Sequence, residues 1–334
     1  MSGGVPVKRQ LSRKTENLTI VRFGVFSERN QKENTMQTEA LKLAMQTASA
    51  SQPERLSWGV VEIQVTDLER TVQFWTSVLG LSVREQTREW AALGTSAKTL
   101  FVFHAGASRP AANGYLGMYH VAIGMPSQSE FSRLLARLMS MQIQISPVDH
   151  LMSKAIYLHD PDGLEIEIAF ETPERFDRFG DMSRGLVLFD SEGRPHSGRE
   201  RLPVDEELSY AHGADLQAAL PDDAFLAHMH FKVSDLESAA SWFEGLGFAR
   251  NLMLTNMGLA DMGAGGSYTH RVAMNTWNGR DLDPTPTDMA RLTRYELLLN
   301  DPAVLINADA LQPSSKGFTG LDPSGVEMVL NFNY

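Results

Sequence analysis

The feature that most constrains the fold is an internal duplication. The segment VTDLERTVQFWTSVLGL (65–81) returns later in the chain as VSDLESAASWFEGLGF (233–248). Each copy follows an alternating strand pattern, GVVEIQV (59–65) or AHMHFKV (227–233), and opens on Thr or Ser followed by Asp-Leu-Glu. This opening is typical of a helix start, with acidic residues near the positive end of the helix dipole. A repeat of this kind predicts a fold built from duplicated supersecondary units.

Each half of the chain divides again into a similar unit. YHVAIGM (119–125) reads as a strand, QSEFSRLLARLMSM (128–141) as an amphipathic helix and AIYLHDPDGLEIEIAF (155–170) as a hairpin. The C-terminal half follows the same order, with PAVLINADAL (302–311) at the place of the helix. The pattern therefore predicts an α+β fold of four βαβββ units. We place these units at residues 57–105, 117–171, 226–278 and 292–333.

The units suggest a division of the chain into four parts. Residues 1–55 are polar, poor in aromatics and basic at the start, and we expect a mobile tail. The first module spans residues 56–172 and the second spans residues 225–334. Residues 173–224 connect the two modules and are rich in proline, glycine and charge.

Composition excludes several classes of function. The net charge is −11 and the isoelectric point is near 5.3, so nucleic acid and anionic membranes have no electrostatic reason to bind. No apolar run approaches the length of a membrane span, and no signal-peptide pattern is visible, so we expect a cytoplasmic protein. The absence of cysteine rules out disulfides, thiolate metal sites and a cysteine nucleophile.

The combination of motifs resembles the vicinal oxygen chelate superfamily, which includes glyoxalases, fosfomycin- and bleomycin-resistance proteins and type I extradiol dioxygenases. The repeated V-[ST]-D-L-E, the Y-H-V-A-I strand and the D-P-D-G-x-x-I-E hairpin carry the resemblance. The catechol 2,3-dioxygenases look most similar, through DHLMSKAIYLHDPDGLEIE (149–167) and GGSYTHRVAMNTW (265–277). The resemblance implies that two units close into one incomplete barrel, so that four units form two incomplete barrels.

The resemblance also implies where metal ligands lie in each unit. One position is on the first strand, and the other is four residues after the glycine of the D-P-x-G turn. These positions hold His120, Glu167 and His228, and His230 on the same strand face is the alternative to His228. Two histidines and one carboxylate are the facial set of non-haem Fe(II) oxygenases, so we expect Fe(II), with Mn(II) as the alternative. The other ligand positions hold Val60, Tyr295 and Val329.

This ligand set requires a particular pairing of the units. In the better-known extradiol enzymes all three ligands lie in units three and four. Here His120 and Glu167 belong to unit two and His228 belongs to unit three. We therefore expect unit two to pair with unit three, and unit one with unit four. Pairing of one with two and three with four would separate the ligands.

Three further residues match functional positions of the family. Tyr157 lies ten residues before Glu167, and His150 lies in the loop ahead of it. By resemblance, these two would hydrogen-bond the substrate oxygens and hold the ligand geometry. His270 matches the acid–base histidine, which would take a proton from the substrate and return it later.

The resemblance therefore implies an extradiol dioxygenase that cleaves catechol or a substituted catechol. Its partners would be a small aromatic diol and O2, and the oligomeric state stays open. A glyoxalase-type lyase or isomerase is a second hypothesis, and it would favour a fourth protein ligand. A small-molecule binding protein of the superfamily, with or without metal, is the third, because Val60, Tyr295 and Val329 indicate that half of the ligand positions have decayed.

Overall fold

The computed structural model describes residues 54–180, 186–266, 268–301, 304, 307 and 311–333. The predicted tail therefore lies outside the described residues, except for its last two positions. Most of the predicted helix at residues 302–311 lies outside them as well.

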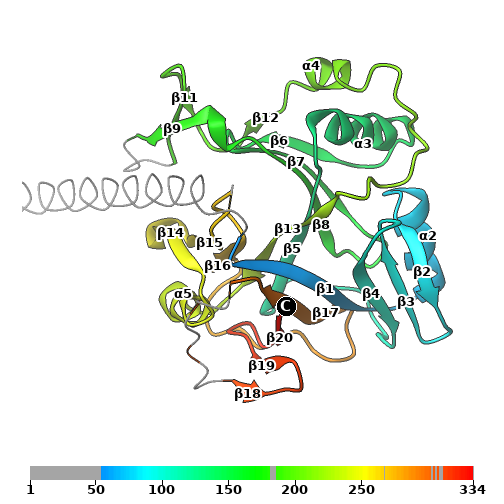
Figure 1. Ribbon diagram of the computed structural model, residues 1–334, viewed down its shortest axis with the longest axis vertical. Coiled ribbons are helices and arrows are strands. Elements are labelled where there is room, and N and C mark those ends of the chain that lie inside the picture. Colours follow the sequence, from blue (N-terminus) through cyan, green and yellow to red (C-terminus); the bar gives the residue numbers. More distant parts are fainter. Residues whose placement is uncertain are drawn as a thin grey trace, which may run out of the picture.

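Two large sheets dominate the architecture (Figure 1). The first has eight strands, and its central neighbours are β17 and β1, which run antiparallel. In spatial order its strands are β18 (Gln312–Pro313), β19 (Gly317–Leu321), β20 (Glu327–Phe332), β17 (Arg291–Leu299), β1 (Leu56–Val65), β4 (Thr99–Ala105), β3 (Trp90–Gly94) and β2 (Ser82–Gln86).

The second sheet has nine strands and the same kind of centre, where β5 and β13 run antiparallel. In spatial order its strands are β12 (Glu200–Arg201), β6 (Ser146–Asp149), β7 (Ser153–His159), β8 (Glu165–Glu171), β5 (Gly117–Gly124), β13 (Phe225–Lys232), β16 (Val272–Asn275), β15 (Leu259–Gly263) and β14 (Ala249–Leu254).

The strand order confirms the predicted pairing of the units. The eight-stranded sheet joins the strands of unit one to those of unit four, and the nine-stranded sheet joins unit two to unit three. Each sheet therefore takes strands from both halves of the chain. The predicted α+β class, with two incomplete barrels, agrees with this arrangement, whereas the module boundaries at residues 172 and 225 stay a prediction.

Helices cover the outer faces of both sheets. Two of them, α2 (Leu68–Ser77) and α5 (Leu236–Glu244), begin at the two copies of the repeated motif. Asp67 and Asp235 cap these helices, and each carboxylate accepts a hydrogen bond from the backbone N–H three residues later. The longer α3 (Gln128–Ser140) packs along β8. The repeat thus fixes the same strand–helix connection in both halves.

The D-P-D-G turn of unit two forms hydrogen bonds with unit one. Asp162 is buried, and its carboxylate accepts hydrogen bonds from the backbone N–H of Thr66 at 2.8 Å and from the guanidinium of Arg70 at 2.6 Å. Thr66 and Arg70 belong to the repeated motif of unit one. Two motifs that are far apart in the sequence therefore form one contact between the sheets.

The connecting segment has structure of its own. It contains a three-stranded sheet with the order β11 (Pro195–His196), β10 (Leu188–Asp190) and β9 (Phe176–Phe179), a 3₁₀ turn η1 (Pro173–Arg175), and α4 (Val204–Ser209). Buried Glu207 of α4 accepts hydrogen bonds from Ser132 on α3 and from Lys154 on β7. These contacts fix the segment against the nine-stranded sheet.

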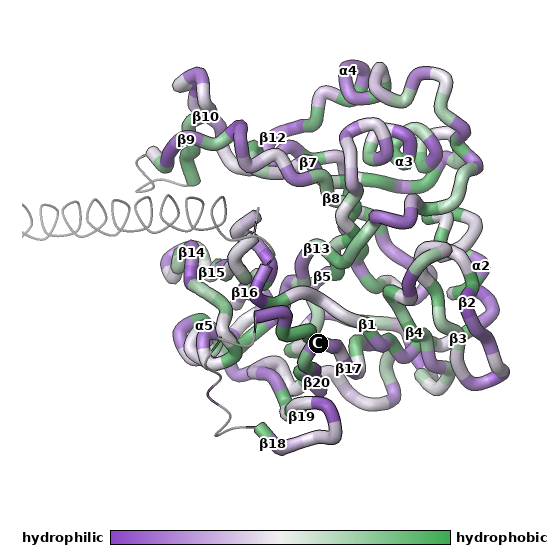
Figure 2. Tube along the Cα trace, viewed as in Figure 1, coloured by the Kyte–Doolittle hydropathy of each residue, from purple (hydrophilic) through white to green (hydrophobic). Residues whose placement is uncertain are grey.

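Apolar side chains of both sheets and of the helices form one continuous core. Figure 2 shows hydrophobic colour gathered along the central strands, with hydrophilic colour on the outer loops. In the described part of the chain, no helix is long and apolar enough to span a bilayer.

Candidate metal centre

Three adjacent strands bring His120, Glu167 and His228 to one point. On the inner face of the nine-stranded sheet, β5 lies between β8 and β13. Ala122 of β5 pairs with Glu167 on one side and with His228 on the other, and His120 is two residues earlier on the same face. The small side chain of Ala122 leaves the space between the ligands open.

A β-bulge brings an extra aromatic ring to this face. His230 pairs with His120, but the next residue of β13 pairs with Met118, so Tyr119 is the extra residue on β5. The ring of Tyr119 contacts those of His120 and His230, with centroid distances of 5.4 and 4.8 Å. The bulge therefore closes one side of the centre with a tyrosine.

The three side chains form a nearly equilateral triangle of donor atoms. His120 Nε2 lies 3.0 Å from Glu167 Oε2 and 3.1 Å from His228 Nε2, and the distance from His228 Nε2 to Glu167 Oε2 is 3.2 Å. Three ligand atoms on one face of an octahedral ion, each at roughly 2.1 Å and mutually perpendicular, are about 3.0 Å apart. The triangle therefore fits a facial set of ligands.

The chemistry of the donors agrees with a cation at this point. All three residues are buried, and their lone pairs converge. Burial lowers the pKa of His228 to about 3, so its imidazole is neutral and able to bind a metal. Burial alone would raise the pKa of Glu167, but the two histidines outweigh it and hold that pKa well below its usual range. A carboxylate and neutral imidazole are the forms that bind metal.

Glu165 lies on the side of the His120 ring that faces away from the ligand triangle. Its Oε1 lies 3.7 Å from His120 Nδ1, an atom that makes no hydrogen bond within the described structure. Burial lowers the pKa of His120, but the nearby carboxylates of Glu165 and Glu167 outweigh it and raise the pKa above its usual value. A carboxylate on this side of a ligand histidine favours the tautomer with the proton on Nδ1, which presents Nε2 to a metal.

Tyr157 and His150 lie together beside the triangle, as the sequence predicts. Tyr157 pairs with Glu167 across the β7–β8 ladder. His150 Nδ1 donates to the carbonyl of Gly198 at 2.7 Å, and its Nε2 accepts from the Tyr157 hydroxyl at 2.9 Å. Burial next to the Glu167 carboxylate raises the pKa of Tyr157 well above its usual value, so the phenol keeps its proton. Both donors are thus used within the protein, and the Tyr157 oxygen keeps a lone pair that can accept a hydrogen bond from a substrate hydroxyl.

His270 lies on the opposite side of His228, just before β16. The two rings have a centroid distance of 4.5 Å and an interplanar angle of 78°. His270 Nδ1 lies 2.8 Å from Asp261 Oδ2 and donates to it, which leaves Nε2 able to accept a proton. A quarter of the His270 side chain is exposed. This geometry suits an acid–base group.

The alternative ligand His230 does not join the triangle. Its Nε2 accepts a hydrogen bond from the Asn275 amide at 2.8 Å, so the atom is already occupied. Among the described residues, the group of possible metal ligands is His120, Glu167 and His228. The geometry therefore favours His228 over His230.

One predicted position in the eight-stranded sheet was wrong by one residue. Unit four was expected to carry Tyr295 at the place of His120. However, β17 pairs Arg294 with Glu327 and with Glu62, whereas β5 pairs His120 with Glu165 and with His230. Arg294 is therefore the counterpart of His120. Tyr295 points to the other face, because a shift of one residue along a strand reverses the side chain.

Sequence reasoning also missed three residues of the centre. Asp261, which holds His270, lies in a short strand without a recognisable motif. Gly198 and Arg199 belong to the connecting segment, which was expected only to link the modules, and the Arg199 guanidinium lies 5.4 Å from the centre of the Tyr157 ring. For these residues the sequence carries no signal, because the contacts depend on segments that are distant along the chain.

Comparison with known proteins identifies the family of this chain. The pattern of the Glyoxalase/Bleomycin resistance protein/Dioxygenase superfamily matches residues 58–168. A protein of Bacillus subtilis (strain 168) named catechol-2,3-dioxygenase is 31% identical over 247 residues, which cover 72% of this chain and 82% of that protein.

Two solved structures share the fold at low identity. A putative dioxygenase from Bacillus subtilis aligns with a TM-score of 0.53 and 12% identity, covering 83% of this chain and 85% of that one. A glyoxalase I mutant from Zea mays aligns with a TM-score of 0.50 and 14% identity, covering 84% and 94%. The duplicated units, the pattern match and the extent of the Bacillus subtilis relative together show that this chain belongs to the glyoxalase/bleomycin resistance/dioxygenase superfamily, the vicinal oxygen chelate superfamily.

Proposed function

We propose that the chain is an extradiol dioxygenase that uses Fe(II) and O2 to cleave catechol or a substituted catechol. The observation that carries the proposal is the buried triangle of two imidazoles and one carboxylate, with donor atoms 3.0–3.2 Å apart. The relative named catechol-2,3-dioxygenase supports the same kind of chemistry. His120, Glu167 and His228 are the proposed ligands, with Mn(II) as the alternative metal.

The ion would supply adjacent coordination positions on which a catecholate and O2 meet, and the protein would supply the proton chemistry. His270 Nε2 takes a proton from the substrate hydroxyl, while Asp261 stabilises the imidazolium through Nδ1. The Tyr157 oxygen, oriented by its hydrogen bond to His150, accepts a hydrogen bond from a substrate hydroxyl near the ligand triangle. Because these groups are buried or half-buried, bulk water has little access to the reacting atoms.

A glyoxalase-type reaction is less well supported. It would favour a fourth protein ligand, and none joins His120, Glu167 and His228 within the described ranges. Three ligands leave more open positions, and a bidentate diol together with O2 needs such positions. The small-molecule binding hypothesis predicts that loss of a ligand histidine leaves binding intact, so the same experiment distinguishes it.

The test is metal analysis of protein purified without oxygen, next to the His228→Ala variant. We expect close to one iron per chain in the parent protein and loss of that iron in the variant. The iron-loaded protein should then turn catechol into a coloured ring-opened product. Absence of metal, or metal that survives the substitution, would contradict the ligand set. Another tightly bound metal without ring cleavage would favour the glyoxalase-type reaction.

Asn275→Ala is a matched control in the same sheet. Asn275 is buried and hydrogen-bonds His230 outside the triangle, so its loss tests general damage to the sheet. We expect this variant to keep its iron.

A further inference from the structure

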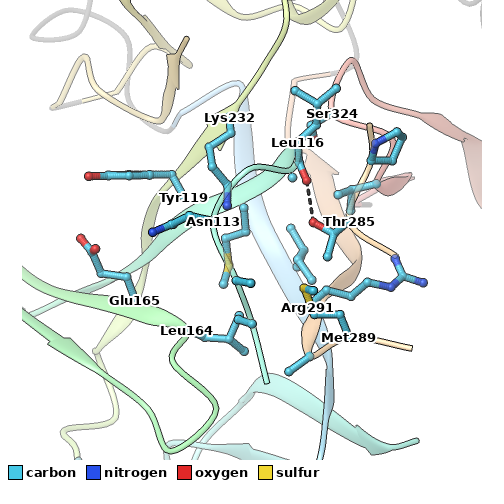
Figure 3. A pocket seen from close by; sticks show the side chains of 18 of the residues that line it. Asn113, Leu116, Tyr119, Leu164, Glu165, Lys232, Thr285, Met289, Arg291 and Ser324 are labelled. Atoms are coloured by element: carbon cyan, nitrogen blue, oxygen red, sulfur yellow. Dashed lines mark hydrogen bonds between the residues drawn. The ribbon is translucent and has the colours of Figure 1, made fainter. Parts of the chain in front are cut away.

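A cavity distinct from the ligand triangle opens where the two sheets meet (Figure 3). Its volume is about 170 Å³, and residues of β5, β8, β13 and β17 line it. None of the three proposed metal ligands is among its lining residues. Tyr119 and Glu165 form the wall on the side of the metal centre.

Lys232 provides a positive charge in this cavity, beside the carboxylate of Glu165 in its wall. It continues the row of His228 and His230 along β13, because every second residue of a strand shares a face. Its side chain reaches into the space between Glu165 and Tyr119 on one side and Thr285 and Met289 on the other (Figure 3).

The ammonium group of Lys232 has no partner. In the parts of the chain that the structure covers, no carboxylate oxygen lies within 4.0 Å of it. Burial lowers the pKa of Lys232, although the charge of Glu165 opposes this shift. Lys232 is half-buried, and a partly desolvated ammonium without a carboxylate partner carries part of its desolvation cost. The cavity therefore contains a cation whose natural partner is an anion.

The remaining walls define the rest of the ligand. Met118, Leu164 and Leu292 are apolar and mostly buried, so they favour an apolar body. The Thr285 hydroxyl already donates to the carbonyl of Leu116 at 2.6 Å. Arg291 also lines the cavity, but Figure 3 shows its guanidinium directed away from Lys232. Lys232 is thus the single cation positioned to bind one anionic group.

We propose that this cavity binds a small organic monocarboxylate, with the Lys232 ammonium as the anchor for its carboxylate and the apolar side chains around its body. A charge-assisted hydrogen bond from a partly desolvated ammonium is among the stronger polar contacts in proteins. The exposed residues Asn113 and His159 mark the entrance on the solvent side. The site does not depend on a metal at the ligand triangle.

Benzoate is a suitable probe, because it combines one carboxylate with a compact apolar ring. Its binding to the full-length protein is measured by calorimetry and by thermal stabilisation, in the parent chain and in three variants. Lys232→Met removes the anchor and keeps the apolar stem. Lys98→Met removes an equal charge from an exposed position. His228→Ala disrupts the metal centre and leaves the cavity intact.

We expect benzoate to bind the parent chain, the Lys98→Met variant and the His228→Ala variant alike, and to bind Lys232→Met at least about tenfold more weakly. Neutral benzamide should bind none of them. The unliganded Lys232→Met variant should melt at the same temperature as the parent chain or slightly higher, since it removes a partly desolvated charge that has no carboxylate partner. Such a melting temperature shows that the variant is folded.

Three outcomes would overturn the proposal. The parent chain shows no stabilisation by benzoate at tens of millimolar, or Lys232→Met binds benzoate as the parent does. In the third outcome, the His228→Ala variant and the Lys232→Met variant both lose benzoate binding. This result would mean that benzoate binds at the metal centre. The iron content and ring cleavage of the parent chain are read separately, so failure here is distinguishable from failure of the proposed dioxygenase activity.

Discussion

The two sheets have the same pattern of strand pairing at their centres, but the side chains on their inner faces differ in chemistry. In the eight-stranded sheet Glu62 faces Arg294 across the β1–β17 pair. In the nine-stranded sheet His230 faces His120 at the equivalent place of the β13–β5 pair. The same backbone geometry therefore presents a carboxylate and a guanidinium in one sheet and two imidazoles in the other.

The other ligand positions differ in the same way. Val329 of β20 takes the place that Glu167 holds on β8, and the repeat places Val60 where His228 lies. At the position of Tyr157 the eight-stranded sheet has Thr319. With Arg294 in place of His120, four substitutions thus separate a candidate metal centre from a structural sheet.

The eight-stranded sheet satisfies its polar groups internally instead. The Tyr295 hydroxyl donates to buried Asp322 at 3.1 Å, and its ring packs against Trp58 with a centroid distance of 5.4 Å. Glu296 accepts from the Asn331 amide at 2.5 Å and from the Val60 backbone N–H at 3.2 Å. A carboxylate whose oxygens already accept hydrogen bonds from protein donors has few lone pairs left to bind a cation.

The largest effect is expected from Glu167→Val, which copies Val329 into the nine-stranded sheet. It removes the negative ligand and leaves two neutral imidazoles, so we expect loss of bound iron and a fall in ring cleavage of more than about a thousandfold. Metal analysis and the catechol colour assay measure both. An iron content equal to that of the parent chain would show that Glu167 is not a ligand.

The next largest effect is expected from His270→Gln. The amide can accept a hydrogen bond but cannot carry the proton, so kcat should fall by about 10²–10⁴. Iron content should stay unchanged, because His270 lies outside the triangle. The pH profile of kcat should also lose one ionisation. An unchanged profile would mean that another group moves the proton.

A smaller effect is expected from pH on metal affinity. The carboxylates Glu165 and Glu167 raise the pKa of His120, so a proton competes with the metal already above the usual histidine range. Affinity should fall by up to about tenfold for each pH unit below that pKa. Metal titration at several pH values measures this fall.

The Glu165→Gln variant sharpens the pH test. Removal of this charge lowers the pKa of His120, so the loss of metal affinity should begin at a lower pH. A profile identical to that of the parent chain would argue that Glu165 does not act on His120.

The smallest effect is expected from Arg294→Ala in the eight-stranded sheet. Arg294 is 42% exposed and its ion pair with Glu62 is 3.4 Å long, so the unfolding free energy should change by no more than about 0.5 kcal/mol. Iron content should not change. Loss of iron here would show that the two sheets are coupled more tightly than their contacts indicate.

The sequence by itself determined the units and most of the candidate site. The repeated Asp-Leu-Glu motif fixes two helix starts through Asp67 and Asp235, and such caps act within a few residues. The register of His120 and Glu167 follows from strand alternation and from the fixed geometry of the D-P-D-G turn. Local patterns of this kind carry their own structural information.

The pairing of the units was predicted only through the resemblance and its ligand set, and tertiary structure alone decided which distant groups complete the centre. The pairing of β5 with β13 depends on long-range burial that no local motif encodes. The bulge at Tyr119, the contact of Asp261 with His270 and the unpartnered Lys232 arise only after the strands meet. The exchange of Tyr295 for Arg294 shows the limit most directly, because one residue of register decides which side chain lies on the face equivalent to the ligand triangle and which enters the core.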